Sequence, residues 1–316
     1  MRYMNPGYKD WFSVIGSTNY LTEVTDTTKT KTGIAFYNTQ PYSNFVQFDY
    51  PASGEIYCKF DFYYKTGSNI TFYFGEFSNG LYPYNGLAFN FSGSTLRLLN
   101  YTKGSWSNIF SGANAIDYGF KIGDINSVLF HLKWTDSENG VMDLQVNNYV
   151  FDQIESTDFT PYDNSNIKFS FSNDSNFPVS NVIISDEEVS IKEQIISIPA
   201  SDTFTTMTFD SETGIYTADS AGQTILQGVN LNSIIADFGS TSKVTGVAMV
   251  GNPAFRTAEG LSALTAIAKK NNVISEYDAV TVSTDSDSLV VSSFNLDSDT
   301  TLATLQNIQL GWKVGG

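Results

Sequence analysis

Apolar and polar residues alternate in short runs over the first 195 residues of the chain. A period of two is typical of β-strands that bury one face, and each run has the length of one strand. Turn-forming residues separate the runs, and no part of this region has the spacing of a convincing amphipathic helix. The pattern therefore predicts an antiparallel β-sandwich. The predicted strands are 55–64, 69–77, 86–91, 95–101, 128–134, 141–146, 166–172 and 179–185.

The alternation also assigns side chains to the two faces of a strand. In the run 55–64 we expect Cys58 on the buried face, as a small apolar side chain rather than a reactive thiol. Because it is the single cysteine, no disulfide can form within the chain. Other residues of the run are expected inward (Ile56, Phe60, Phe62, Tyr64) or outward (Tyr57, Lys59, Asp61, Tyr63).

The aromatic content changes near residue 195, which indicates two domains. Of the Phe, Trp and Tyr residues, 38 lie in 1–195 and 8 in 196–316, so the two regions need different cores. Apolar spacing in the second region predicts short helices at 228–238 and 260–270 among strands, and hence a smaller α+β or mostly β domain. The predicted parts are an N-terminal arm at 1–32, a sandwich domain at 33–190, a linker at 191–198 and a C-terminal assembly domain at 199–316.

Two stretches stand out within the strand series between residues 33 and 188. They are a hairpin, HLKWTDSENGVMDLQVNN at 131–148, and a closing strand, FPVSNVIISDEEVS at 177–190. With these features the region resembles the concanavalin A-like lectin/glucanase superfamily, particularly its laminin-G-like and pentraxin-like members. The resemblance implies a jelly roll, a fold that hosts lectins, hydrolases and purely structural modules. Glucanases of this superfamily carry a Glu-x-Asp-x-x-Glu strand, which is missing here, and the adjacent acids at 186–188 indicate a solvated turn.

Charge and hydropathy limit the possible partners. The formal net charge is −16 at pH 7, and the pI is about 4.3. Both predicted domains are acidic, whereas nucleic acids and anionic membranes bind basic faces, so we exclude these partners. No run approaches the roughly 20 apolar residues that span a bilayer, and the first residues lack the apolar core of a signal peptide. We expect no membrane insertion, and a location on a virion or an extracellular surface.

Candidates for catalysis are few. His131 is the only histidine, and its place in VLFHLKW puts it opposite Phe130 and Leu132, on the outward face. Serine–histidine triads and multi-histidine metal sites are thereby largely excluded. No nucleotide-binding pattern is present either. We therefore predict a protein that is not an enzyme.

Calcium stays open as a ligand, because it is common in the laminin-G-like domains that this region resembles. Loop carboxylates and carbonyls bind it, but no Asp-x-Asp-x-Asp-Gly loop is present, so solvated turns are the favoured interpretation. The oxygen donors in question are Asp136, Glu138 and Asn139, and in the second domain Asp285, Asp287, Asp297 and Asp299.

Two turn-rich stretches, 78–86 (SNGLYPYNG) and 100–108 (NYTKGSWSN), combine aromatic and amide residues. Aromatic rings stack on the C–H faces of sugars, amides exchange hydrogen bonds with hydroxyls, and loops often carry function. A chain so rich in tyrosine also places some rings in loops by chance, so the absence of any site remains the alternative. The candidate carbohydrate-binding residues are Asn79, Tyr82, Tyr84, Asn85, Tyr101, Trp106 and Asn108.

Together these observations favour a non-enzymatic structural or adhesive protein of a phage or phage-like particle, such as a fibre, decoration or receptor-binding subunit. Its expected partners are further copies of itself, other particle or surface proteins, and a cell-surface glycan. The Thr-rich stretch 1–32 is expected either to pack on another subunit or to dock on its own chain. The alternatives are a bacterial cell-surface or filament-forming adhesin, and a glycan hydrolase.

Overall fold

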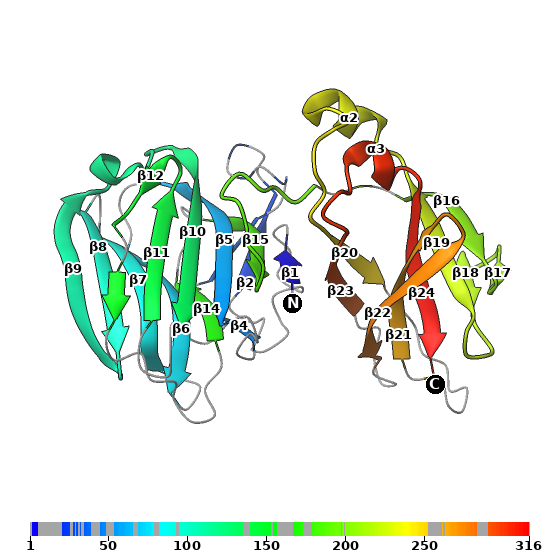
Figure 1. Cartoon of the computed structure of the whole chain (residues 1–316), viewed down its shortest axis with the longest axis horizontal. Helices are drawn as coiled ribbons and strands as arrows, with labels where there is room; N and C mark the ends of the chain where they lie inside the picture. Colours follow the sequence, from blue (N-terminus) through cyan, green and yellow to red (C-terminus); the bar gives the residue numbers. More distant parts are fainter. Residues whose placement is uncertain are drawn as a thin grey trace. The chain divides into compact units, whose positions relative to one another are not determined.

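The computed structural model describes residues 2–5, 21–25, 28, 30, 32, 35–38, 45–48, 54–65, 69–78, 82–92, 95–134, 140–152, 154–156, 167–172, 178–196, 198, 200–251, 261, 263–282 and 290–315. The chain divides into two compact units, Met1–Ile196 and Ser197–Gly316, which are both visible in Figure 1. Among the described residues, no helix has the length and apolar character needed to cross a membrane.

The first unit contains a nine-stranded antiparallel sheet. Its main path runs β12-β11-β10-β5-β15-β3-β2, with β1 paired to β15 and β13 paired to β11. The predicted hairpin is confirmed, because β10 and β11 pair from Val128 opposite Val146 to Trp134 opposite Gly140. The strands are β1 (Arg2–Asn5), β2 (Leu21–Val24), β3 (Ala35–Asn38), β5 (Glu55–Tyr64), β10 (Asp124–Trp134), β11 (Gly140–Val146), β12 (Tyr149–Val150), β13 (Ile154–Ser156) and β15 (Val179–Ser185).

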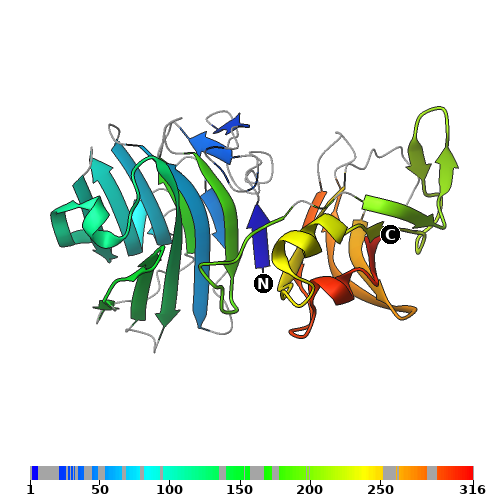
Figure 2. The ribbon, with the colours of Figure 1, turned by 90° about the horizontal axis from the view of Figure 1, so that it is seen from above.

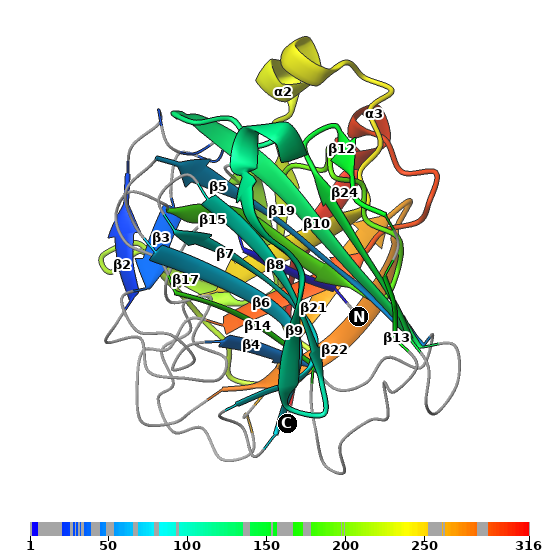
Figure 3. The same cartoon turned by 90° about the vertical axis from the view of Figure 1, so that its left-hand side faces the viewer.

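A six-stranded antiparallel sheet forms the second layer of this unit. Its order is β4-β14-β6-β7-β8-β9, and Figure 2 shows the two sheets as separate layers. The short 3-10 helix η3 (Ala115–Tyr118) follows β9. The strands are β4 (Phe45–Phe48), β6 (Asn69–Ser78), β7 (Tyr82–Ser92), β8 (Thr95–Thr102), β9 (Ser105–Asn114) and β14 (Ile167–Ser172), and all six are labelled in Figure 3.

The two sheets enclose one aromatic core, as the period-two pattern requires. Phe60 of β5 stacks on Phe72 of β6 with ring centroids 4.8 Å apart, so the contact crosses from one sheet to the other. The inward assignments in β5 are confirmed, because Ile56, Phe60, Phe62 and Tyr64 are all fully buried. Cys58 is buried among them, and this burial raises the pKa of its thiol well above the usual value. The fold is a mainly β jelly-roll sandwich.

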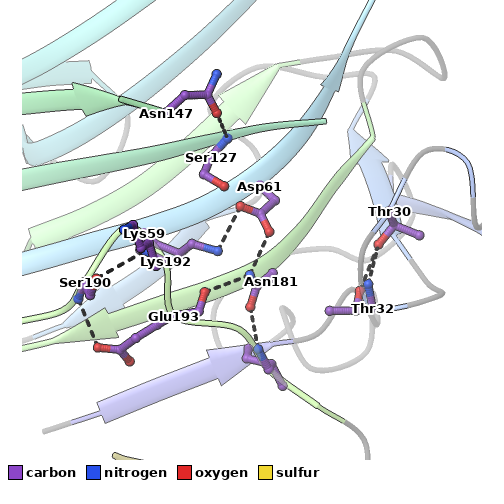
Figure 4. A network of polar contacts seen from close by, with 11 residues as sticks. Thr30, Thr32, Lys59, Asp61, Ser127, Asn147, Asn181, Ser190, Lys192 and Glu193 are labelled. Carbon is purple, nitrogen blue, oxygen red and sulfur yellow. Dashed lines mark hydrogen bonds and ion pairs between the residues drawn. The ribbon is translucent and has the colours of Figure 1, made fainter. Parts of the chain in front are cut away.

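Of the two alternatives for residues 1–32, the described parts show docking on the same chain, because β1 pairs with β15 and β2 pairs with β3 within the nine-stranded sheet. One expectation for the first unit is wrong. Lys59 and Asp61 were expected to face solvent, yet both are fully buried. The segment after β15 covers them, as residues 191–196 of the expected linker lie on the first unit (Figure 4).

The second unit is mostly β. A five-stranded antiparallel sheet runs β16-β19-β24-β21-β22, and two further pairs, β17-β18 and β20-β23, lie outside it. Ala266, Val282, Phe294 and Trp312 form the centre of its core. The elements are β16 (Ala200–Thr205), β17 (Thr208–Asp210), β18 (Ile215–Thr217), β19 (Thr224–Val229), α2 (Asn232–Phe238), β20 (Gly246–Gly251), β21 (Ala263–Lys270), β22 (Val273–Thr281), β23 (Val290–Asn295), α3 (Leu302–Leu305) and β24 (Ile308–Gly315).

The helix predicted at 228–238 is present only from residue 232 onward, as α2, because residues 228 and 229 end strand β19. The helix predicted at 260–270 is wrong. That stretch forms strand β21, which pairs with β24 on one side and β22 on the other. Ala266, Ile267 and Ala268 are buried in succession, as expected for a strand covered on both faces. Such a continuous apolar run does not distinguish strand from helix by its periodicity.

Candidate functional site

The six-stranded sheet has a second set of side chains on the face that points away from the sandwich core. Tyr73, Ala88 and Leu99 lie opposite one another on β6, β7 and β8 and form a small apolar cluster of their own, with Tyr101 packed against it. Residues directly opposite in an antiparallel pair share one face. The register therefore extends this surface, here called the aromatic face, over Thr71, Tyr73, Ala88, Asn90, Arg97, Leu99, Tyr101, Trp106 and Asn108.

Tyr101 and Trp106 form the aromatic centre of this face. Tyr101 on β8 is paired with Trp106 on β9, next to the turn that joins the two strands. The Tyr101 ring meets the Tyr73 ring edge-on at 5.4 Å between centroids, with 88° between the ring planes. Trp106 is 57% exposed, although most of a large apolar side chain is usually covered. A buttressed row of rings thus ends in one ring that is open to solvent.

Polar groups flank the rings on the same strands. Asn108 is exposed two residues beyond Trp106, opposite Leu99. Arg97 is exposed on β8 and lies opposite Asn90, whose Nδ2 donates to Thr71 Oγ1 at 2.7 Å. The sequence interpretation did not include Arg97 or Asn90. The alternation in TLRLLNY places Arg97 on the face opposite Leu96 and Leu98, and this was the available signal.

Two glycines shape the surface next to Tyr73. Gly75 and Gly86 lie opposite each other on β6 and β7. A Cβ atom on Gly75 would come within 2.2 Å of the Asn85 carbonyl oxygen and 2.6 Å of the Gly86 Cα. The Tyr73 hydroxyl donates to that same carbonyl oxygen at 2.8 Å. The ring of Tyr73 is therefore held in place at a point where the two strands approach too closely for side chains.

Asn85 lies on β7 and is buried, whereas the sequence predicted it in an exposed loop. It is fully buried, and its Oδ1 accepts a hydrogen bond from the Lys103 backbone N–H at 2.9 Å. The Gly104 N–H donates to the Tyr84 carbonyl oxygen at 3.0 Å. These two bonds attach the β8–β9 turn to β7. The partly buried Tyr84 ring lies beside the same turn, because a Cβ on Gly104 would be 3.8 Å from Tyr84 Cδ2.

The remaining candidates divide into three groups. Tyr101, Trp106 and Asn108 are brought together, although they lie on strands and not on the loops that the sequence suggested. Tyr82 begins β7 and pairs with Ser78, but its side chain lies outside the described residues. Asn79 also lies outside the described residues.

A second polar cluster surrounds the only histidine, on the outer face of the nine-stranded sheet. His131 on β10 places Nδ1 2.9 Å from Asp143 Oδ2 and Nε2 3.2 Å from Glu55 Oε2. Its ring is stacked on Tyr57 with centroids 4.2 Å apart and planes within 4°. The imidazole therefore stands between the two carboxylates and is only 17% exposed. The prediction that His131 faces outward is correct, but the sequence did not reveal these partners.

Tyr57 has a perturbed acidity in this cluster. Desolvation by burial, followed by the negative charges of Glu55 and Glu188, raises the pKa of Tyr57 to about 12. The Tyr57 hydroxyl donates to Glu55 Oε2 at 3.4 Å, which further favours the neutral phenol.

The calcium candidates gain no support from the described part of the chain. Asp136, Glu138 and Asn139 of the hairpin loop, and Asp285 and Asp287, lie outside the described residues. Asp297 and Asp299 are exposed near the end of β23. Within the described ranges, no group of three or more His, Cys, Asp or Glu side chains could hold a metal ion.

No protein-family model and no curated protein sequence matches the chain. Solved structures do match it. An endo-β-1,4-glucuronan lyase from the fungus Trichoderma reesei is 13% identical with a TM-score of 0.40, over 58% of this chain and 94% of that one. The carbohydrate recognition domain of Emp46p, in its metal-free form, is 12% identical with a TM-score of 0.36, over 59% and 97% of the two chains.

A third similar structure is the CBM2 module of the evolved Dit protein of Lactobacillus casei BL23 phage J-1. It is 10% identical with a TM-score of 0.34, over 58% of this chain and 96% of the module. The solved structures that resemble this chain thus include jelly rolls of lectins, binding modules and lyases. Some of them are enzymes and others are binding domains, and at these identities the similarity concerns the fold alone.

Proposed function

We propose that the first unit is a non-enzymatic glycan-binding module, and that the aromatic face holds the sugar. The observation that carries this proposal is the exposure of Trp106, at 57%, directly opposite Tyr101. A flat apolar ring open to solvent offers a stacking platform for the C–H face of a sugar. Asn108 lies two residues from Trp106 on the same face and offers an amide, and Arg97 lies farther along β8 on that face and offers guanidinium donors for hydroxyl or carboxylate groups.

The polar cluster at His131 supports a binding role over hydrolysis. A glycosidase needs two carboxylates that flank the scissile bond, one of them free to protonate the leaving oxygen. Glu55 and Asp143 both face the imidazole of His131, so that ring occupies the space between them. Turnover of polysaccharides by the purified protein would restore the hydrolase alternative.

The test is a glycan array probed with the full chain and two variants. Trp106→Ala removes the exposed platform and should lower the affinity for any bound glycan by roughly 1–3 kcal/mol, which is about tenfold or more. The matched control is Phe204→Ala on β16 of the second unit, which removes another aromatic ring that is 50% exposed. Equal binding by the wild type and Trp106→Ala would reject the site, whereas Phe204→Ala should bind as the wild type does.

The second unit is proposed to mediate assembly of identical copies. Hairpin β17–β18 pairs with no other described strand, and its Phe209 and Ile215 are 52% and 49% exposed. Two-stranded hairpins are marginally stable alone, which supports coverage by a second copy. Native mass spectrometry should find an oligomer that Phe209→Ser weakens. A wild-type monomer would contradict this.

The two units are further proposed to fold independently, since each has its own core. Residues 1–196 and 197–316 expressed apart should each unfold cooperatively.

We also keep the outer surface of a phage or phage-like particle as the proposed location. The support is the acidic composition of the chain and its low proportion of charged residues, 16%. Immunogold labelling of purified particles and of bacterial surfaces distinguishes this location from the adhesin alternative.

A further inference from the structure

A lysine, an aspartate and an asparagine meet beneath the segment that follows β15. Lys59 and Asp61 lie two residues apart on β5, and the Lys59 Nζ atom is 2.8 Å from Asp61 Oδ1. Asn181 on the neighbouring strand β15 donates from Nδ2 to Asp61 Oδ2 at 2.7 Å. All three residues are 0% exposed. Figure 4 shows their side chains directed toward one another, with the carboxylate between the amine and the amide.

A β-bulge brings Asn181 into this group. Ser180 lies opposite Asp61, and the next paired position is Ile183 opposite Lys59, so β15 has two residues between these pairs where β5 has one, which is one residue more than in a regular pairing. In a regular strand the residue after Ser180 would face the sandwich core. Asn181 instead has a φ of 53°, a left-handed conformation that Asn tolerates better than most residues, and its side chain joins the Lys59 and Asp61 side.

The segment after β15 closes the site and orients the amide. The Ile195 N–H donates to Asn181 Oδ1 at 2.8 Å, and Asn181 Nδ2 also donates to the Glu193 carbonyl oxygen at 3.2 Å. The segment is itself fixed by the Ser190 N–H, which donates to Glu193 Oε1 at 3.0 Å. The amide is therefore held by both of its polar atoms, in a position from which solvent is excluded.

We propose that Lys59 and Asn181 become joined by an intramolecular isopeptide bond, with Asp61 as the proton carrier. The arrangement supplies each group that amide transfer requires. Lys59 Nζ is the nucleophile, Asn181 Cγ is the electrophile, and Asp61 contacts both the amine and the leaving nitrogen. The Ile195 N–H donates to Asn181 Oδ1, the oxygen on which negative charge develops during attack. It is therefore placed to act as an oxyanion-hole donor.

The reaction balances without an oxidant or a co-reactant. Asp61 first takes a proton from the Lys59 ammonium, which leaves a neutral amine. Nζ attacks Asn181 Cγ, the Nζ–Cγ bond forms, and Oδ1 carries the negative charge. Asp61 then gives its proton to Nδ2 and takes the next one from Nζ. Oδ1 regains its double bond, the Cγ–Nδ2 bond breaks, and its electron pair leaves with the nitrogen as ammonia. The products are a secondary amide, ammonia and protonated Asp61.

The bond would tie two adjacent strands that lie far apart in the sequence. β5 and β15 are hydrogen-bonded neighbours, and the chain leaves β15 toward the second unit. A pulling force on that chain would reach β5 through a covalent bond as well as through the sheet. Such a link suits a module exposed to shear, although the proposal does not depend on what the aromatic face binds.

The test is mass spectrometry of the full chain. The intact mass should be lower than the sequence mass by one ammonia molecule. Trypsin should release residues 32–65 and 169–192 as one linked pair, uncleaved after Lys59. Asn-Gly pairs at 79–80, 85–86 and 139–140 also lose ammonia when they form succinimides, so fragmentation of the linked pair must place the bond at Lys59 and Asn181.

Variants distinguish the Lys59–Asn181 cross-link from other reactions that release ammonia or water. Lys59→Met and Asp61→Asn should both abolish the linked pair. Lys65→Arg, which removes the exposed amine directly after β5 and keeps the trypsin site, should leave it intact. A wild-type chain without the linked pair after prolonged incubation in the folded state overturns the proposal. A loss of water that joins Lys59 to Asp61 also overturns it. The wild-type peptide map decides the question even where a variant does not fold.

Discussion

Trp106 lies directly opposite Tyr101 across β8 and β9, and Tyr101 in turn meets Tyr73 edge-on. The exposed ring therefore rests at the end of a row whose inner members are progressively more buried, since Tyr101 is partly buried and Tyr73 is 1% exposed. This order places the platform on a strand pair and not on a free loop.

The supporting ring should be nearly as important for binding as the exposed one. Tyr101→Ala removes the cross-strand neighbour of Trp106, and we expect about a tenfold loss of glycan affinity, or roughly 1–2 kcal/mol. Tyr101→Phe keeps the ring and should bind within about threefold of the wild type. Titration calorimetry with a glycan selected on the array measures both. Equal losses in the two variants would show that the hydroxyl matters and the ring does not.

Affinity should increase with the length of the glycan. Arg97 and Tyr101 are four residues apart on β8, which is about 13 Å along a strand, so one sugar ring cannot contact both. Oligosaccharides long enough to reach Arg97 should bind more tightly than shorter ones of the same series, and Arg97→Ala should remove that gain. Calorimetry over the series provides the comparison. A gain with length that persists in Arg97→Ala would place the extended ligand elsewhere.

Gly75 should tolerate no side chain. Alanine at this position would place its Cβ 2.2 Å from the Asn85 carbonyl oxygen, which is backbone and cannot easily move. We expect Gly75→Ala to lower the free energy of unfolding by about 3 kcal/mol, which is the upper part of the range for overpacking. Gly112→Ala is the control, because Gly112 also has a positive φ but has nothing within 4 Å of the added atom. Urea denaturation should show a clearly smaller loss for the control.

Tyr57 should make the protein sensitive to alkali over a defined interval. Its pKa rises from 10.0 to about 12 in the folded state, so the folded chain keeps this proton after the unfolded chain has lost it. Its contribution to stability is complete below about pH 10 and is lost as the pH rises toward 12. Tyr57→Phe removes the titration, and its stability should decline less than that of the wild type across this interval. Parallel declines in urea denaturation from pH 9 to 12 would contradict the assignment.

The sequence predicted the sandwich well because period-two alternation directly reports burial on one side of a strand. Phe60 and Phe62 follow this rule, and so does His131 on the opposite face. The rule failed at Lys59 and Asp61, since a segment more than 120 residues later covers them, and local alternation carries no information about that segment. It also failed at β21, where burial on both faces removes the alternation.

The sequence identified three residues of the candidate site but placed them on loops instead of strands. Tyr101, Trp106 and Asn108 were selected as loop residues, because Lys103 and Gly104 indicate a turn. The turn is only two residues long, so the strands extend through the candidates on both sides. Arg97 joins them through the pairing of β7, β8 and β9, and a single sequence does not reveal that register.

A crystal structure of the chain with an oligosaccharide selected on the glycan array would show directly whether the aromatic face binds sugar. We expect a sugar ring stacked against the indole of Trp106, with hydroxyl groups within hydrogen-bond distance of Asn108 and a longer ligand extending toward Arg97. A glycan bound on the outer face of the nine-stranded sheet or in the second unit, with Trp106 still open to solvent, would contradict this expectation.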